Sequence, residues 1–143
     1  MKLKTFTICI VFLLLAPITS LAEKTHVEVF DIEEGKVVEE SPSTLEIQKE
    51  TEKVILSISG VYKNLDPLPQ KGVMVKIPLD PPISLKNEWF QDFVNEAVLI
   101  FSYEEEDPYI LIWDDENLPH FYTFNASTEK LMKMIKFQPI IKD

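Results

Sequence analysis

The sequence predicts an α+β domain in which an antiparallel sheet is packed by two helices. Residues 96–124 contain three runs rich in β-branched and aromatic residues, separated by two short acidic turns, which predicts a three-stranded meander. Residues 43–59 carry apolar residues at helical spacing, and a second such segment occupies about 126–136. Strands and helices that follow one another in this irregular order are typical of α+β domains.

The first elements of the domain are a hairpin and a helix. Strand-like residues 26–32 and 36–39 flank a turn at Glu34 and Gly35, which predicts the hairpin. Ser43 and Glu46 then fit a capping box, in which each side chain satisfies a backbone donor at the start of a helix. The helix is expected to stop at Gly60, and its apolar stripe consists of Ile47, Val54, Ile55, Ile58 and Val61.

The middle of the chain is rich in proline, which favours extended and turn conformations. Residues 72–77 alternate well enough to predict one strand, and Asp80-Pro81-Pro82 is expected to end it. For residues 87–94 we expect one or two helical turns, because Trp89, Phe90, Phe93 and Val94 would share one helical face. The aromatic content of this segment would also suit a strand.

The meander consists of predicted strands at 96–103, 108–113 and 119–124. If the turn at 104–107 sets the register, Phe101 faces Ile110 and Leu99 faces Ile112 on one side of the sheet. The other side then carries Ser102, Tyr109, Leu111 and Trp113. After the meander, Asn125 or Ser127 is expected to cap the last helix, whose inward side chains are Leu131, Met134 and Ile135.

The N-terminus predicts export. Lys2 and Lys4 precede an apolar run and then Ser20 and Ala22, the order of a secretory signal peptide that is cleaved after residue 22. Residues 23–143 then form a single domain that contains no cysteine, because Cys9 leaves with the signal. We therefore expect a secreted protein, extracellular or associated with the cell envelope, with no stable membrane insertion after cleavage and the uncleaved anchor as the alternative.

The charge of the chain limits its partners. The formal net charge is −10, and all 14 basic residues are lysine, so arginine is absent. Such a chain repels phosphate backbones and lacks the planar fork that binds them bidentately, so nucleic acid is not expected as a partner. Cations and basic partners remain compatible with this charge.

A resemblance indicates the host. The stretch from Ile58 to Pro82, together with Asp114-Asp115-Glu116-Asn117 and residues 119–124, is similar to small secreted proteins of Bacillus-type Gram-positive bacteria. This resemblance covers most of the exported chain and implies a Gram-positive exporter. That family has no assigned activity, so the resemblance assigns no functional residue.

No motif in the sequence specifies a reaction, and no cofactor is expected. His26 and His120 lack metal-site spacing, and the three glycines form no phosphate loop. The oxygen-rich turn is a weak calcium candidate, although it departs from the EF-hand spacing; its residues are Asp114, Asp115 and Glu116. A pair of carboxylates for a hydrolase is a further alternative, but the sequence favours no particular pair.

The predicted meander contains more aromatic residues than its strands ordinarily need for packing. This excess is explained either by burial of both sheet faces, under the helices and the N-terminal hairpin, or by an exposed aromatic surface. Such a surface would bind an extended peptide, a glycan or a lipid through Tyr109, Trp113, His120 and Tyr122. We therefore expect a secreted, non-catalytic binding or regulatory protein with an extracellular partner or ligand, and a carboxylate hydrolase or a weak calcium binder as alternatives.

Overall fold

The computed structural model describes residues 25–139, and the predicted signal peptide lies outside this range. The elements of the described range are β1 His26–Asp31, β2 Lys36–Pro42, α2 Leu45–Leu56, β3 Ile58–Val61, β4 Gly72–Lys86, β5 Gln91–Ser102, β6 Tyr109–Trp113, β7 Pro119–Phe124 and α3 Glu129–Ile135. All strands belong to one antiparallel sheet in the order β2-β1-β4-β5-β6-β7-β3. The α+β class is confirmed, and the sheet is larger than the predicted hairpin, strand and meander.

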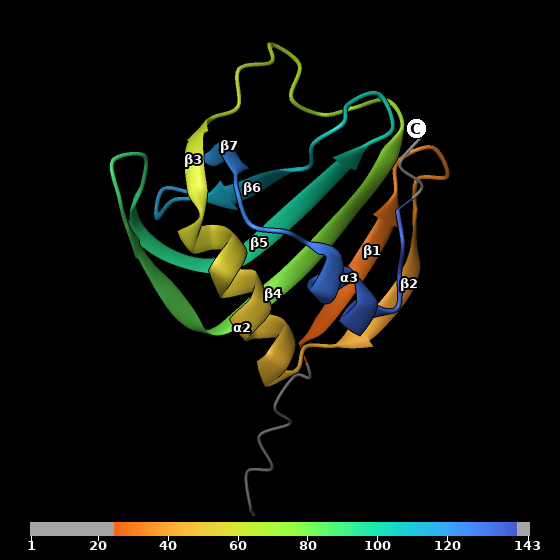
Figure 1. Cartoon of the computed structure of the whole chain (residues 1–143), viewed down its shortest axis with the longest axis horizontal. Helices are drawn as coiled ribbons and strands as arrows, with labels where there is room; N and C mark the ends of the chain where they lie inside the picture. The colour runs from red at the N-terminus through yellow and green to blue at the C-terminus, as the bar shows by residue number, and fades with distance from the viewer. Residues whose placement is uncertain (1–24, 140–143) are drawn as a thin grey trace, which may run out of the picture.

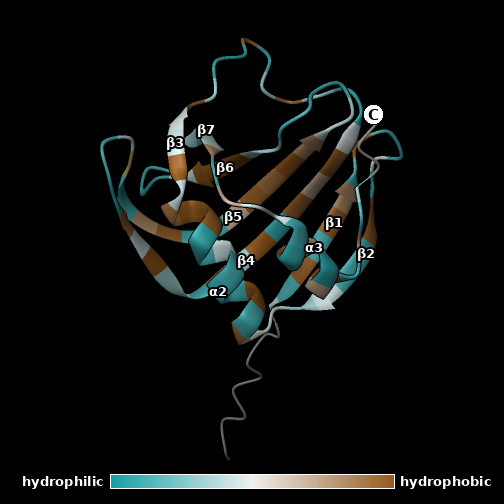
Figure 2. Cartoon of the chain, in the orientation of Figure 1, coloured by the Kyte–Doolittle hydropathy of each residue, from teal (hydrophilic) through white to brown (hydrophobic). Residues whose placement is uncertain are grey.

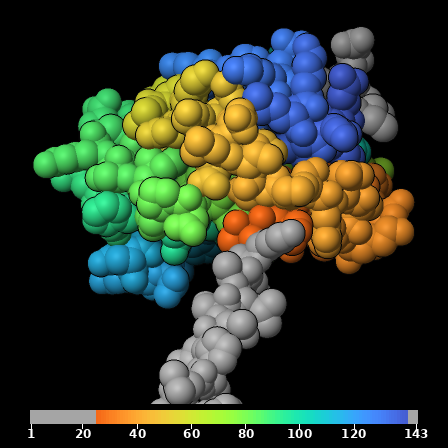
Figure 3. Space-filling view, turned by 90° about the horizontal axis from the view of Figure 1, so that it is seen from below, coloured from red at the N-terminus to blue at the C-terminus, as the bar shows by residue number. Residues whose placement is uncertain are grey.

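Both helices lie on one face of the sheet, which we call the helix face (Figure 1). Figure 3 shows α2 and α3 next to each other on the same side of the molecule. Their buried side chains pack against alternate residues of the strands beneath them, where Figure 2 shows hydrophobic residues concentrated. The buried helical side chains are Ile47, Thr51, Val54, Ile55, Leu131, Met132 and Ile135.

The first helix is shorter than predicted at both ends. Thr44 caps it by accepting a hydrogen bond from the Ile47 amide at 3.3 Å, whereas the Ser43 hydroxyl donates to the carbonyl of Pro78. At the other end Ser57 closes the helix, and Ile58 to Val61 pair with β7 as strand β3. Ile58 and Val61 fit the helical spacing, but they pair with the edge of β7 and therefore belong to a strand.

The predicted helical turns at 87–94 are wrong. Asn87 instead forms the tip of the β4–β5 hairpin, and its side-chain oxygen accepts hydrogen bonds from the amides of Trp89 and Phe90 at 2.8 Å. Side chains of this segment alternate between inside and outside as in a strand: Phe90 and Val94 are buried while Trp89 and Phe93 are exposed.

The prolines do not end β4 as predicted. Its pairing with β5 is interrupted between Pro78 and Ile83 and then resumes as far as Lys86. An irregularity of this kind accommodates proline, which cannot donate to the ladder. The outer part of the β4–β5 hairpin, residues 83–94, thereby forms an arm that extends beyond the rest of the sheet (Figure 1).

At the C-terminal end, the helix starts later than predicted. Its cap position is Thr128, and the Ser127 hydroxyl accepts from the Glu129 amide at 3.3 Å. Met132 is buried, whereas Met134, which we expected to face inward, is only partly buried. The part of the chain that the structure describes contains no helix long and apolar enough to cross a membrane.

The meander register differs from the conditional prediction by two residues. Leu99 pairs with Ile110 and Ala97 with Ile112, because the connection between β5 and β6 is longer than a four-residue turn. A slip of two residues preserves the side on which each side chain lies. Leu99, Phe101, Ile110 and Ile112 therefore still share the helix face.

The opposite face, which we call the outer face, carries a second apolar cluster. Its buried members are Val98, Ile100, Tyr109 and Leu111, and its partly buried neighbours are Tyr62, Met74, Trp113 and Phe121. The N-terminal hairpin does not cover this face, as we had considered, because β1 and β2 are strands of the same sheet. Residues 62–71 between β3 and β4 cover part of it, since Tyr62 stacks on Tyr109.

Candidate functional site: a groove on the outer face

The four aromatic and histidine residues proposed from the sequence do not form one surface. Trp113 pairs with Pro119 and Ile112 pairs with His120 across the β6–β7 hairpin. Since neighbours across a hairpin share a face, Tyr109 and Trp113 belong to the outer face, whereas His120 and Tyr122 belong to the helix face.

Two of these four residues serve as anchors for loops. Tyr109 is 2% exposed, and its hydroxyl donates to the carbonyl of Pro67 at 2.7 Å; burial raises the pKa of this phenol far above its ordinary value. Tyr122 is 3% exposed, and its hydroxyl donates to the carbonyl of Trp89 at 3.0 Å. Tyr109 thus holds the 62–71 loop, and Tyr122 holds the tip of the arm.

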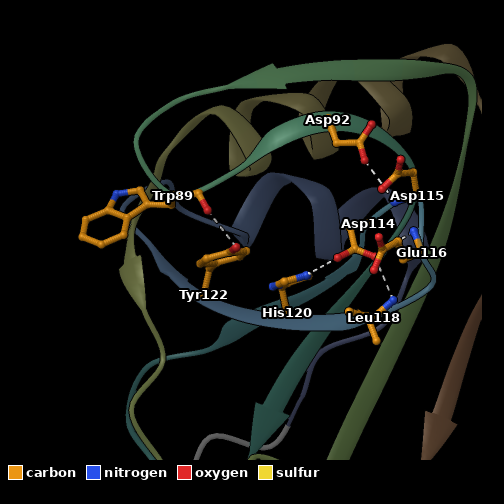
Figure 4. Close-up of polar contacts among 8 residues, drawn as sticks. All are labelled: Trp89, Asp92, Asp114, Asp115, Glu116, Leu118, His120 and Tyr122. Carbon is orange, nitrogen blue, oxygen red and sulfur yellow. Dashed lines mark hydrogen bonds and ion pairs between the residues drawn. The ribbon is translucent and has the colours of Figure 1, made fainter.

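Asp114 organises the turn between β6 and β7 (Figure 4). Its Oδ1 accepts hydrogen bonds from the amides of Glu116 at 3.0 Å and Leu118 at 2.9 Å, and its Oδ2 lies 2.7 Å from Nε2 of His120. The hydrogen bond to His120, followed by those from the backbone, lowers the pKa of Asp114. The imidazole of His120 is parallel to the ring of Tyr122 and meets the edge of Phe90.

The arm also fixes this turn. Asp92 of β5 accepts a hydrogen bond from the amide of Asp115 at 3.0 Å (Figure 4). The carboxylate of Asp114 is therefore occupied by protein donors, while Asp115 takes part through its backbone. Within residues 25–139 no group of three or more His, Cys, Asp or Glu side chains is placed to hold a metal ion, including the calcium candidates Asp114, Asp115 and Glu116.

On the outer face, the β6–β7 turn borders a hollow of about 410 Å³. It is lined by Trp113 at the end of β6, Asn95 and Glu96 of β5, and Asn117 of the turn. Asn117 has φ 60°, a left-handed conformation that asparagine tolerates better than most residues. The Asp114 hydrogen bonds on either side of Asn117 keep the turn in this conformation, so the hollow has a fixed wall.

Two further hollows lie along β6 and β7. The middle hollow, about 240 Å³, is lined by Pro119 to Tyr122 of β7 and by Val61, Tyr62, Asn64 and Pro67. The third, about 560 Å³, is lined by Ser59, Tyr62, Glu105, Asp107, Pro108, Tyr109, Thr123, Phe124 and Asn125. Pro119 is the cross-strand neighbour of Trp113, and Tyr62 lines both later hollows. We call this series of three hollows the outer groove.

Each hollow of the outer groove combines aromatic and amide side chains. Trp113 accompanies Asn95 and Asn117 in the first, Tyr62 and Phe121 accompany Asn64 in the middle one, and Tyr62 accompanies Asn125 in the third. The sequence contains five asparagines, and the fifth, Asn87, forms the arm tip. Nearly all of the asparagine in the chain therefore lines this one groove.

Tyr62 has a fixed position between the middle and third hollows. Its ring stacks on Tyr109 with centroids 3.9 Å apart, and its hydroxyl donates to the carboxylate of Glu105. Burial, with a further contribution from this hydrogen bond, raises the pKa of Tyr62. An aromatic ring held in this way loses little conformational freedom when a ligand binds.

Comparison with protein-family models, with curated proteins and with solved structures finds no match for this chain. The site must therefore be interpreted from its own geometry.

Of the proposed surface residues, Trp113 and Tyr109 line the outer groove from the outer face. His120 and Tyr122, whose rings pack with Phe90 on the helix face, only border its middle hollow. Sequence reasoning missed Tyr62, Phe121 and the four asparagines. A signal existed for Phe121, because alternation along β7 places it beside Leu111. No local signal identifies Tyr62 or Asn64, because the return of the 62–71 loop over Tyr109 is a tertiary contact.

Proposed function

We propose that this protein is an exported, non-catalytic glycan-binding protein and that the outer groove holds an extended carbohydrate chain. The observation that supports this most is the combination of aromatic rings with asparagine in all three hollows. A pyranose ring has an apolar C–H face that packs on an aromatic ring, and its hydroxyls both donate and accept hydrogen bonds. An asparagine amide offers a donor and an acceptor side by side, which matches such hydroxyls.

The dimensions of the groove favour a chain over a single sugar. It follows β6 from Trp113 to Tyr109, four residue steps or about 13 Å at the rise of an antiparallel strand. Its two ends are lined by polar side chains, and Pro119 and Phe121 lie between them. An extended oligosaccharide can therefore contact all three hollows at once.

The other ligands considered from the sequence fit less well. An extended peptide would add to a free sheet edge, and the available edge strands β2 and β3 both contain register irregularities that discourage such pairing. A lipid would require a continuous apolar lining, whereas every hollow contains amide or carboxylate groups. Export through the predicted signal peptide would place the groove where cell-envelope glycans are found.

A carboxylate hydrolase is the second candidate, because Glu105 and Asp107 line the same hollow. The proposal of binding without catalysis follows from the structural task of Glu105, which accepts the hydrogen bond that positions Tyr62. Incubation of the exported form with polysaccharides should therefore release no new reducing ends. Release that Glu105→Gln abolishes would replace the binding proposal with the hydrolase.

The binding test uses the two tryptophans of the chain as a matched pair. Trp113 lines the groove, and Trp89 is exposed at the arm tip outside it. Affinity electrophoresis and calorimetry with a panel of envelope polysaccharides should detect binding by the wild type. Trp113→Ala should weaken binding tenfold or more, the effect of losing a central aromatic contact of about 1.4 kcal/mol, while Trp89→Ala should bind like wild type. Absence of binding across the panel, or equal loss in both variants, would refute the proposal.

A further inference from the structure

We infer that the glycan of the outer groove carries protonated amino groups, and that the hollow of Trp113 and Glu96 seats one of them. This inference rests on the proposed function and specifies the class of sugar, a hexosamine with a free amine. It follows from the charges that line the groove and from where these charges lie.

All ionisable side chains with a full charge that line the groove are carboxylates. Glu96 lines the first hollow, and Glu105 and Asp107 line the third. In the described chain no lysine lines any of the three hollows, and the whole sequence contains no arginine. A formal net charge of −10 strengthens the attraction for cationic ligands and the repulsion of anionic ones. Uronic acids and phosphate-bearing polymers are therefore disfavoured.

The first hollow has the arrangement that recognises an ammonium group. An indole ring attracts a cation to its face, and a neighbouring carboxylate supplies the opposite charge. Trp113 and Glu96 provide these two groups, and Asn95 and Asn117 remain for the hydroxyls of the same sugar. A neutral acetamido group would leave the Glu96 carboxylate without a cation.

Lysine near the first hollow does not remove this negative charge. The hydrogen bond to Glu28 is the main cause that raises the pKa of Lys76, and the nearby charge of Glu96 adds a smaller contribution. The ammonium of Lys76, however, is 3.0 Å from the Glu28 carboxylate on the neighbouring strand β1. The three groups Glu28, Lys76 and Glu96 together carry a net negative charge, which a ligand cation can balance.

The charges also differ along the groove. The middle hollow is lined by apolar, aromatic and amide side chains together with His120, and none of its lining residues is a carboxylate. The carboxylates lie in the first and third hollows, at opposite ends of β6. A chain of several amino sugars would therefore have an amine balanced at each end and the C–H faces of its central units against the aromatic rings.

The test compares two oligosaccharides of equal length and linkage, a β-1,4-linked glucosamine oligomer and its fully N-acetylated form. Calorimetry at low ionic strength and a pH at which the amines are protonated should give at least tenfold tighter binding of the glucosamine oligomer. Added salt should reduce this preference, because the charges are near solvent. Glu96→Gln should remove most of it, whereas Glu88→Gln, an equal charge change at the arm tip, should retain it.

The outcomes separate this inference from the proposed function. Equal binding of both oligomers, or tighter binding of the acetylated one, would overturn the amine assignment while glycan binding stands. Equal loss in Glu96→Gln and Glu88→Gln would show attraction by overall charge and would overturn the role of Glu96. Failure of both oligomers and of the polysaccharide panel would refute both proposals.

Discussion

The Asp114 carboxylate and the His120 imidazole, which lie at the two ends of the β6–β7 turn, meet at 2.7 Å. This contact links residues on the two faces of the sheet at this end of the β6–β7 hairpin. His120 is packed with Phe90 and Tyr122 on the helix face, and the turn it closes places Asn117 beside Trp113 on the outer face. Stability of the turn and the shape of the first hollow are therefore linked.

The first prediction concerns the pH dependence of this link. The pKa of Asp114 is lower in the folded chain than the value of about 3.9 for an unfolded aspartate. The contacts of Asp114 thus stabilise the fold above that pH, and their contribution is lost as pH falls through the folded pKa. Asp114→Asn should melt below wild type near about pH 5, and the difference should shrink towards about pH 2.

Thermal unfolding of both proteins across this pH range is the measurement. Glu116→Gln provides the control, because it removes the same charge from the same turn while leaving the Asp114 contacts in place. Its melting temperature should stay near that of wild type throughout. A constant difference between Asp114→Asn and wild type down to the lowest pH would contradict the linkage.

The sequence predicts those parts of the fold that local pattern determines. The stripe of Ile47, Val54 and Ile55 identifies α2, and alternation identifies the strands of the meander and the faces of their residues. The sequence misplaces those helix and strand boundaries that depend on tertiary pairing. Ile58 satisfies a helical stripe equally well, and only the presence of β7 beside it makes it a strand residue.

The site is less predictable, because its parts come from separate segments. Trp113 stands out in the sequence as an aromatic residue at a strand end. Asn95, Asn117 and Asn64 line the same groove from strand β5, the β6–β7 turn and the 62–71 loop. The Asp114 to His120 contact also depends on the hairpin register, which the sequence leaves open by steps of two residues.

The second prediction concerns the contribution of Trp113 to stability. The sequence alone does not decide whether this residue belongs to the core or to the surface. The side chain is partly buried against the outer cluster and also lines the first hollow. Trp113→Ala should therefore cost about 2 kcal/mol, less than the 3–5 kcal/mol typical of a fully buried tryptophan. Leu111→Ala is the control; it truncates a neighbour that is 7% exposed and should cost about 2–4 kcal/mol.

Denaturant unfolding measures both losses. A cost for Trp113→Ala below about 1 kcal/mol would mean that the indole acts only at the surface, and one above about 3 kcal/mol that it acts as a core residue. Either result would contradict the intermediate burial. The predicted value leaves the variant folded, so that its ligand binding can be measured.

The third prediction separates the backbone role of Asn117 from the role of its side chain. With φ 60°, alanine at this position is strained by about 1–2 kcal/mol, whereas glycine adopts the conformation freely. Asn117→Ala should therefore lower the free energy of unfolding by about that amount, and Asn117→Gly by only a few tenths of a kcal/mol. Both substitutions remove the amide that lines the first hollow.

Because both variants lose this amide, they should weaken glycan binding to a similar extent despite their different stabilities. Parallel denaturant and calorimetric titrations give the two quantities, with wild type as reference. Binding that follows stability, lost in Asn117→Ala and retained in Asn117→Gly, would show that Asn117 shapes the turn without contacting the ligand. Equal losses of affinity in the two variants, despite their unequal stability, would show that the Asn117 amide contacts the sugar.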